Sequence, residues 1–191
     1  MSKIDLLAFC DTHDIRYFLR TPFSDGAYTC ATDGKILVRV PRIDTINENP
    51  KISGTTGKIF KIIDDFSGEY VSLADYMLPD FDVSPRTKQL TCDECGGLGR
   101  EHDCPDCECE CEACDGTGKY EYTVVPKASV EVLGLNFGLR YIAKIWTLPA
   151  LTVAVSGDSL VFKFDGGAGV LMKIEGKYEQ HFGPLKARKE Q

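Results

Sequence analysis

The chain has 191 residues and a formal net charge of −7, with 43% hydrophobic and 27% charged residues. This composition is typical of a globular protein and leaves room for one buried core and a small appendage. No apolar run reaches the roughly 18–20 residues of a membrane span, and the N-terminus lacks the apolar stretch of a signal peptide. We therefore expect a cytoplasmic protein without a membrane segment.

The first half of the chain combines helical and strand patterns. Apolar spacing predicts, in chain order, a helix, three strands and another helix at residues 2–10, 15–20, 27–32, 35–40 and 58–66. Asp33 and Gly34 stand between the second and third strands, which is a strong signal for a two-residue hairpin turn.

The second half returns to the same order. A strand, a helix and three further strands are predicted at residues 129–133, 136–146, 151–156, 159–165 and 169–175. Since a helix followed by a three-stranded meander occurs twice, we infer an internal structural repeat in a protein of the α+β class.

The distribution of cysteines points to metal ligation. Seven of the nine cysteines lie between Cys92 and Cys114, and reducing conditions in the cytosol disfavour disulfides. Cys10 and Cys30 lie apart among apolar residues, so we interpret them as small core side chains.

Two Cys-x-x-Cys pairs, which we name knuckles, frame this segment. Cys92 pairs with Cys95, and Cys111 pairs with Cys114 after a gap of 15 residues. The spacing matches a zinc ribbon, because two intervening residues let both sulfurs reach one tetrahedral ion. Glycines after each knuckle permit positive φ, so that backbone amides can turn toward the thiolates. We predict zinc rather than a disulfide or a redox pair, because a redox Cys-x-x-Cys stands alone beside a βαβ pattern.

The repeated Cys-x-x-Cys-x-Gly-x-Gly pattern resembles the cysteine-rich domain of DnaJ-type co-chaperones over residues 88–122. The glycines of that motif fall on Gly97, Gly99, Gly116 and Gly118. In that family the outermost knuckles share one zinc ion and the inner knuckles share another. The resemblance therefore implies an outer site formed by Cys92, Cys95, Cys111 and Cys114.

The inner site departs from this pattern. Only Cys104 and Cys107 form a knuckle there, and no glycine pair follows it. His102 and Cys109 can complete four ligands; the alternative is a solvated histidine and a free thiol. We therefore expect one or two zinc ions per chain. The sequence lacks the His-Pro-Asp tripeptide of a J-domain and any counterpart of the peptide-binding domains, so co-chaperone function is not implied.

The cysteine segment also carries the acidity of the chain. Residues 92–118 contain nine acids and one base, a net charge of −8, whereas the rest of the chain sums to +1. Because nucleic-acid affinity comes from Lys and Arg, this zinc finger should avoid DNA and prefer a basic protein surface.

The same segment is expected to be an insertion. Residues 88–91 and 119–124 flank it and can pair as the base of a hairpin. An insertion whose ends lie together leaves the host fold intact. We therefore expect a body formed by residues 1–87 and 123–191, interrupted by a zinc-binding β-hairpin module at residues 88–122.

Four stretches of the body are similar to the bacterial DNA polymerase sliding clamp (beta subunit). They are a hairpin at residues 31–37, a segment with Pro-Asp-aromatic at residues 73–85, a helix opening at residues 133–142 and the last strands at residues 165–174. The resemblance implies the repeated strand–helix–three-strand fold of the clamp and a place in DNA replication, with a replication protein as partner. A clamp chain carries several such domains and closes into a ring, whereas this chain has material for one, which leaves a homo-oligomer open. The zinc insertion is foreign to clamps.

The predicted helix at residues 136–146 carries one narrow basic stripe. Asn136, Arg140 and Lys144 fall within about 80° of arc, and every other position is apolar or glycine. The corresponding clamp helices face DNA, so the resemblance implies DNA contact through Arg140 and Lys144. The alternative is a solvated face that happens to be basic.

Motifs of common enzymes are missing from the sequence. It holds no G-x-S-x-G, Walker or H-E-x-x-H pattern, and its three histidines are scattered. We expect a non-enzymatic zinc-binding accessory protein that acts in DNA replication or processing by binding proteins and DNA. The alternative is a zinc-dependent protein-binding adaptor or chaperone-like module without DNA binding. A thiol oxidoreductase is the third hypothesis.

Overall fold

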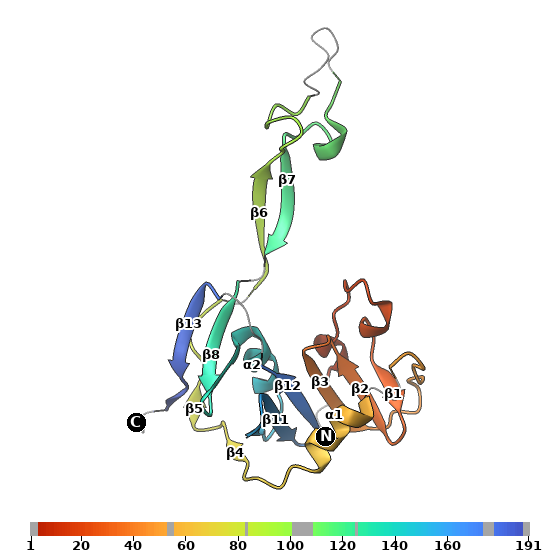
Figure 1. Ribbon diagram of the computed structural model, residues 1–191, viewed down its shortest axis with the longest axis vertical. Helices are drawn as coiled ribbons and strands as arrows, with labels where there is room; N and C mark the ends of the chain where they lie inside the picture. Colours follow the sequence, from red (N-terminus) through yellow and green to blue (C-terminus); the bar gives the residue numbers. More distant parts are fainter. Residues whose placement is uncertain are drawn as a thin grey trace. The chain divides into compact units, whose positions relative to one another are not determined.

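The computed structural model describes residues 4–52, 56–82, 84–100, 109–124, 126–173 and 178–188. The chain divides into two compact units, which are described separately (Figure 1). We name the first unit, Met1–Phe81 with Lys127–Gln191, the body, and the second unit, Asp82–Pro126, the arm. The described part is mostly β structure with two α-helices, which agrees with the expected α+β class. None of its helices is long and apolar enough to span a membrane.

A seven-stranded sheet in the order β1-β2-β3-β12-β11-β10-β4 forms the centre of the body. Its strands are β1 (Phe23–Asp25), β2 (Tyr28–Thr32), β3 (Ile36–Pro41), β4 (Val71–Ser72), β10 (Thr152–Ser156), β11 (Ser159–Phe164) and β12 (Gly167–Met172). Two antiparallel meanders, β1-β2-β3 and β10-β11-β12, join edge to edge where Leu37 pairs with Val170. The strands predicted at residues 27–32, 35–40, 151–156 and 159–165 are therefore confirmed within one or two residues.

The junction between the two meanders explains a glycine in β12. A Cβ atom added at Gly169 would lie 2.4 Å from the carbonyl oxygen of Leu37 and 2.3 Å from the ring of Phe162. Only glycine lets the backbone of β3 and a buried aromatic ring approach β12 this closely.

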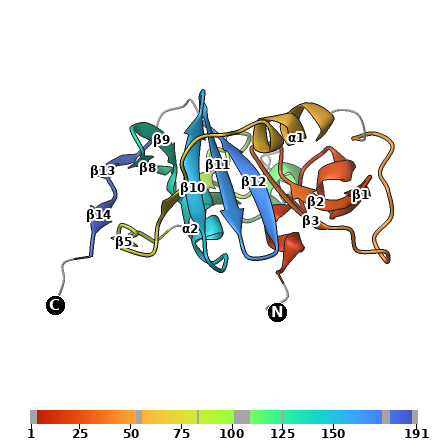
Figure 2. The same cartoon turned by 90° about the horizontal axis from the view of Figure 1, so that it is seen from below.

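Both faces of the large sheet are covered. Helix α1 (Thr56–Asp64) packs on β11 and β12 and buries Ile63 against Val161 and Val170 (Figure 2). The alternate residues Leu160 and Phe162 point to the opposite face and are also fully buried. The predicted helix at residues 58–66 corresponds to α1.

A second, three-stranded sheet supports helix α2 (Leu139–Trp146). Its order is β13 (Gln180–Pro184), β8 (Ala128–Val132) and β9 (Leu135–Gly138); β13 runs parallel to β8 and β9 antiparallel. The last strand, β14 (Lys186–Ala187), pairs with β5 (Tyr76–Met77). The helix predicted at residues 136–146 is too long at its start, because Asn136 belongs to β9 and pairs with Glu131.

The strand predicted at residues 15–20 is wrong. This segment contains a 3₁₀ turn, η2 (Tyr17–Leu19), in which only Leu19 is buried. The carboxylate of Asp14 accepts a hydrogen bond from the backbone amide of Arg16 at 2.7 Å and pairs with its guanidinium at 2.7 Å, which bends the chain. The N-terminal helix is likewise a short 3₁₀ turn, η1 (Leu6–Phe9), capped by Asp5.

The arm contains one antiparallel hairpin, β6 (Arg86–Thr91) with β7 (Lys119–Val124), which we name the stem (Figure 1). The predicted pairing of residues 88–91 with residues 119–124 is confirmed by this register. A 3₁₀ turn, η3 (Glu112–Cys114), follows Cys111.

Candidate metal centre

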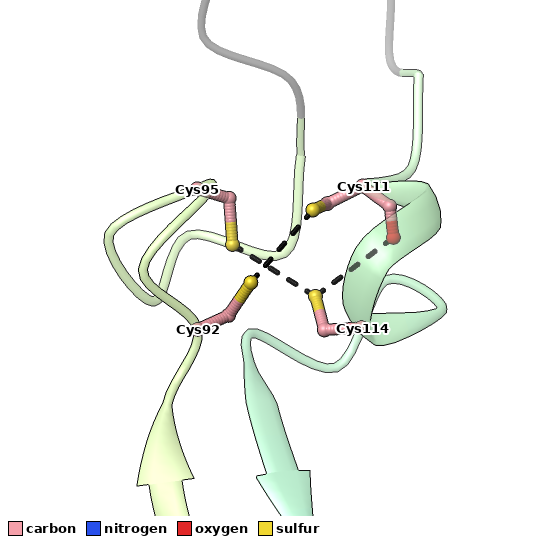
Figure 3. A group of neighbouring side chains, drawn as sticks. All are labelled: Cys92, Cys95, Cys111 and Cys114. Atoms are coloured by element: carbon pink, nitrogen blue, oxygen red, sulfur yellow. Dashed lines mark hydrogen bonds between the residues drawn. The ribbon is translucent and has the colours of Figure 1, made fainter.

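The four cysteines of the two knuckles meet at the end of the stem. Cys92 directly follows β6, and the second knuckle ends four residues before β7 begins, so the strand pairing brings both knuckles together. The four sulfur atoms lie within 4.8 Å of one another and point toward a common centre (Figure 3). All four side chains are buried.

The distances between the sulfurs fit a tetrahedral metal ion. Cys92 Sγ lies 3.9 Å from Cys111 Sγ, and Cys95 Sγ lies 3.8 Å from Cys114 Sγ. Four thiolates about 2.3 Å from a tetrahedral ion would be about 3.8 Å apart. A disulfide requires a separation of about 2 Å. The four sulfurs could therefore hold one tetrahedral metal ion.

The two knuckles have the same backbone structure and hold each other in place. The amide of Cys92 donates to Gly118 O at 2.9 Å, and the amide of Cys111 donates to Gly99 O at 3.0 Å. The amides of the same two glycines each donate to a sulfur: Gly99 N to Cys95 Sγ and Gly118 N to Cys114 Sγ, both at 3.2 Å. Such N–H···S bonds stabilise the charged form of a thiolate ligand.

The last glycine of the turn that follows each knuckle is required by its surroundings. Gly99 has φ +73° and Gly118 has φ +70°. A Cβ atom added at Gly99 would lie 2.2 Å from Gly116 O, and one added at Gly118 would lie 2.3 Å from Gly97 O. Any other residue would therefore push the two knuckles apart.

Tyr120, which the sequence did not single out, completes the site. It packs against the four cysteines, and its hydroxyl lies 3.1 Å from Cys92 Sγ. This hydrogen bond lowers the pKa of Cys92 to about 6, whereas burial raises the pKa of Cys111 to about 12. The two thiols would therefore differ in protonation at neutral pH. A bound cation would remove this difference, because it deprotonates every thiol that coordinates it. The sequence feature that could have identified Tyr120 is its position as the second residue of β7, the strand that follows the second knuckle.

The residues described in the arm offer little else that could hold it folded. Every residue of β6 is exposed, and the buried hydrophobic cluster of the arm consists of the four cysteines with Tyr120 against them. An isolated two-stranded hairpin is only marginally stable in water. The cysteine cluster therefore takes the place of a hydrophobic core.

The predicted inner site is mostly beyond what the structure describes. His102, Cys104 and Cys107 lie outside the described residues. Cys109 is described and exposed, and it is not among the four clustered sulfurs.

The predicted DNA contacts lie on helix α2 beside a buried tyrosine. Arg140 donates a hydrogen bond to the hydroxyl of Tyr141 at 2.6 Å, and Lys144 Nζ lies 5.9 Å from the centre of the same ring. Burial raises the pKa of Tyr141 to about 12, and the neighbouring carboxylate of Asp33 adds to the shift. Arg140, Lys144 and the carboxylate of Asp33 therefore all lie near the same tyrosine. Asn136, on β9, is not on their helix.

Fold and site together define a mostly β protein of the α+β class with a four-cysteine cluster that could bind a metal ion. No protein-family model matches the chain, and no curated protein matches it. A similar solved structure is that of a protein from Eubacterium rectale, provisionally described as a DNA polymerase III beta subunit. The identity is 13% and the TM-score 0.33, with 90% of this chain covered. The chain spans 61% of that protein's length. This likeness is too weak to assign a fold or a function.

Proposed function

We propose that this protein is a non-enzymatic accessory protein in DNA replication or processing, whose arm is held by one zinc ion and binds another protein. The observation that carries the proposal is the cluster of four buried sulfurs, 3.8 and 3.9 Å apart in pairs, which forms the buried cluster of the described part of the arm. The zinc holds the arm folded, and the folded arm presents the binding surface.

Zinc is the ion that suits this donor set. Soft thiolates in a tetrahedral array select zinc or iron–sulfur chemistry, and two Cys-x-x-Cys knuckles around one centre are typical of structural zinc. Four cysteine ligands leave no open position for water or substrate, so the ion has a structural role. This supports a binding protein rather than an enzyme.

The topology of the body supports a clamp-like scaffold. A short helical segment followed by three antiparallel strands occurs as η1 with β1-β2-β3 and again as α2 with β10-β11-β12. The two meanders share one sheet through β3 and β12. A helix followed by three strands also recurs in the sliding clamp that the sequence resembles, and this parallel motivates the proposed role in DNA replication or processing.

The charge of the arm favours a protein partner. Its described tip presents five exposed carboxylates, which form no ion pair with any described residue: Asp93, Glu94, Glu110, Glu112 and Asp115. A tetrathiolate zinc site adds two more negative charges. The tip should therefore repel DNA and attract a basic protein surface.

A zinc-dependent adaptor without DNA binding is the second candidate. It is favoured by the surroundings of α2, where Arg140 and Lys144 share Tyr141 and have Asp33 nearby. Cations that already have partners in their own chain contribute less to phosphate binding.

DNA binding at low salt separates the two candidates. Fluorescence anisotropy with a labelled DNA duplex should show binding that weakens when Arg140→Ala and Lys144→Ala are combined. The matched control is Lys58→Ala with Lys61→Ala, which removes the same charge from the exposed side of α1. Equal losses in the two variants would indicate non-specific attraction. If zinc-loaded protein does not bind DNA in any oligomeric state, the adaptor becomes the better proposal.

A further inference from the structure

The two faces of the stem differ in chemistry: one combines apolar or aromatic side chains with Arg86 and Lys88, and the other is polar throughout. The register pairs Arg86 with Val124, Lys88 with Tyr122 and Leu90 with Tyr120, and paired residues point to the same side. One face therefore carries four apolar or aromatic side chains, which we name the stem stripe: Leu90, Tyr120, Tyr122 and Val124. The opposite face carries only polar and charged residues: Thr87, Gln89, Thr91, Lys119, Glu121 and Thr123.

The stem stripe is uncovered. Leu90 is 55% exposed and Tyr122 is 40% exposed, while Tyr120 and Val124 are half-buried. A single exposed leucine is ordinary in a folded protein. Four neighbouring apolar side chains on one face of a hairpin are different, because an amphipathic sheet normally packs its apolar face on a core.

The stripe is joined directly to the metal centre. Tyr120 lies opposite Leu90, packs against the four cysteines and places its hydroxyl 3.1 Å from Cys92 Sγ. A metal that orders the knuckles therefore also fixes the end of the stripe.

The two ends of the stripe differ in charge. On the same face, Arg86 pairs with Val124 at the end far from the knuckles, and Lys88 pairs with Tyr122 in the middle of the stripe. The knuckle end adjoins the five exposed carboxylates of the described tip. A segment that complements both ends has apolar side chains, lysine or arginine toward the knuckles and an acidic residue toward Arg86.

We propose that the stem stripe is a docking surface for a segment of a partner protein with this chemistry: apolar side chains followed by basic residues. At about 3.4 Å per residue, six-residue strands give the segment a track of about 20 Å. The inference rests on the proposed function, because the stripe is ordered only while the arm holds its metal.

A second copy of the chain is a poorer occupant. Residues 92–118 carry a net charge of −8 in each copy, so two arms repel each other. A stripe of four side chains also falls short of the roughly 800 Å² that each partner buries in a standard stable interface.

The test uses the full-length, zinc-loaded protein and a display library of random peptides of about twelve residues, twice the length of the stem strands. Enriched peptides should combine apolar residues with lysine or arginine. Synthetic copies should lose affinity about tenfold or more when Leu90→Ser and Tyr122→Ser are combined, because two central apolar contacts are removed. The matched control, Thr87→Ser with Thr123→Ser on the opposite face, should bind as the wild type does. Both variants should keep their zinc.

Three results would overturn the stripe as a docking surface. These are a selection that enriches no peptide, enriched peptides without basic residues, and binding that survives the loss of Leu90 and Tyr122. A dimer that the same substitutions dissolve would identify a second copy as the occupant instead. Protein without zinc contradicts the proposed function itself, whereas zinc-loaded protein with an inert stripe contradicts this inference alone.

Discussion

Replacing the last glycine of the turn that follows either knuckle by alanine should weaken zinc binding strongly. Gly99 and Gly118 have φ near +70°, where a residue with a Cβ atom costs about 1–2 kcal/mol. The new Cβ would also lie 2.2 Å or 2.3 Å from a backbone oxygen of the other knuckle. Relieving this contact moves the knuckles apart and lengthens the N–H···S bonds. A total of about 3 kcal/mol corresponds to about 100-fold weaker zinc binding, since folding of the arm and binding are coupled.

Competition with a coloured zinc chelator measures this loss. The titration gives the dissociation constant for zinc. For Gly99→Ala and for Gly118→Ala this constant should be about 100-fold higher than for the wild type. The control is Gly26→Ala in the body, which also has a positive φ of 56° but no atom within 4 Å of the added Cβ; it should leave zinc affinity unchanged. Wild-type affinity in both knuckle variants would refute the close packing of the knuckles.

Two further predictions concern the independence of the body from the arm and the stability of the body. Removing zinc with a chelator should abolish hydrogen-exchange protection at residues 92–100 and 109–118 and leave the body protected, because the body has its own core; global loss would mean that the body depends on the arm. The guanidinium of Arg39, beside Asp64, holds the pKa of that carboxyl below its usual value, so the pair stabilises the fold at neutral pH and is lost as the pH falls through the lowered pKa. Asp64→Asn should lower the free energy of unfolding at pH 7 by about 1 kcal/mol, allowing for solvent screening of the half-exposed carboxylate, and flatten its acid dependence. Denaturant unfolding checks this; Asp65→Asn is the matched control, and equal effects of both would contradict the role of the pair.

Local signals with a direct geometric cause were sufficient to predict parts of the fold. The turn at Asp33 and Gly34 forms because the Asp33 carboxylate accepts the amides of Lys35 and Ile36, and Gly34 takes φ +86°. Apolar and polar residues alternate along the strands on either side, because successive side chains of a strand point to opposite faces of the sheet. The two knuckles came together as predicted because both lie at the end of a paired hairpin.

Other features depend on contacts that no local pattern records. Ile15 and Tyr17 alternate with polar residues as a strand would, yet Ile15 is 93% exposed because Asp14 bends the chain. Asn136 fits the stripe of a helix, but pairing with Glu131 places it in β9. The parallel pairing of β13 with β8 joins segments about fifty residues apart, and sequence spacing gives no sign of it.

Zinc-edge X-ray absorption on protein purified without added metal shows whether the four cysteines hold zinc. Cys104→Ser and Cys107→Ser, combined, restrict the metal to the four-cysteine cluster. We expect one zinc ion per chain with four sulfur neighbours at about 2.3 Å. Protein without zinc, or a zinc ion surrounded mainly by nitrogen and oxygen, would contradict it.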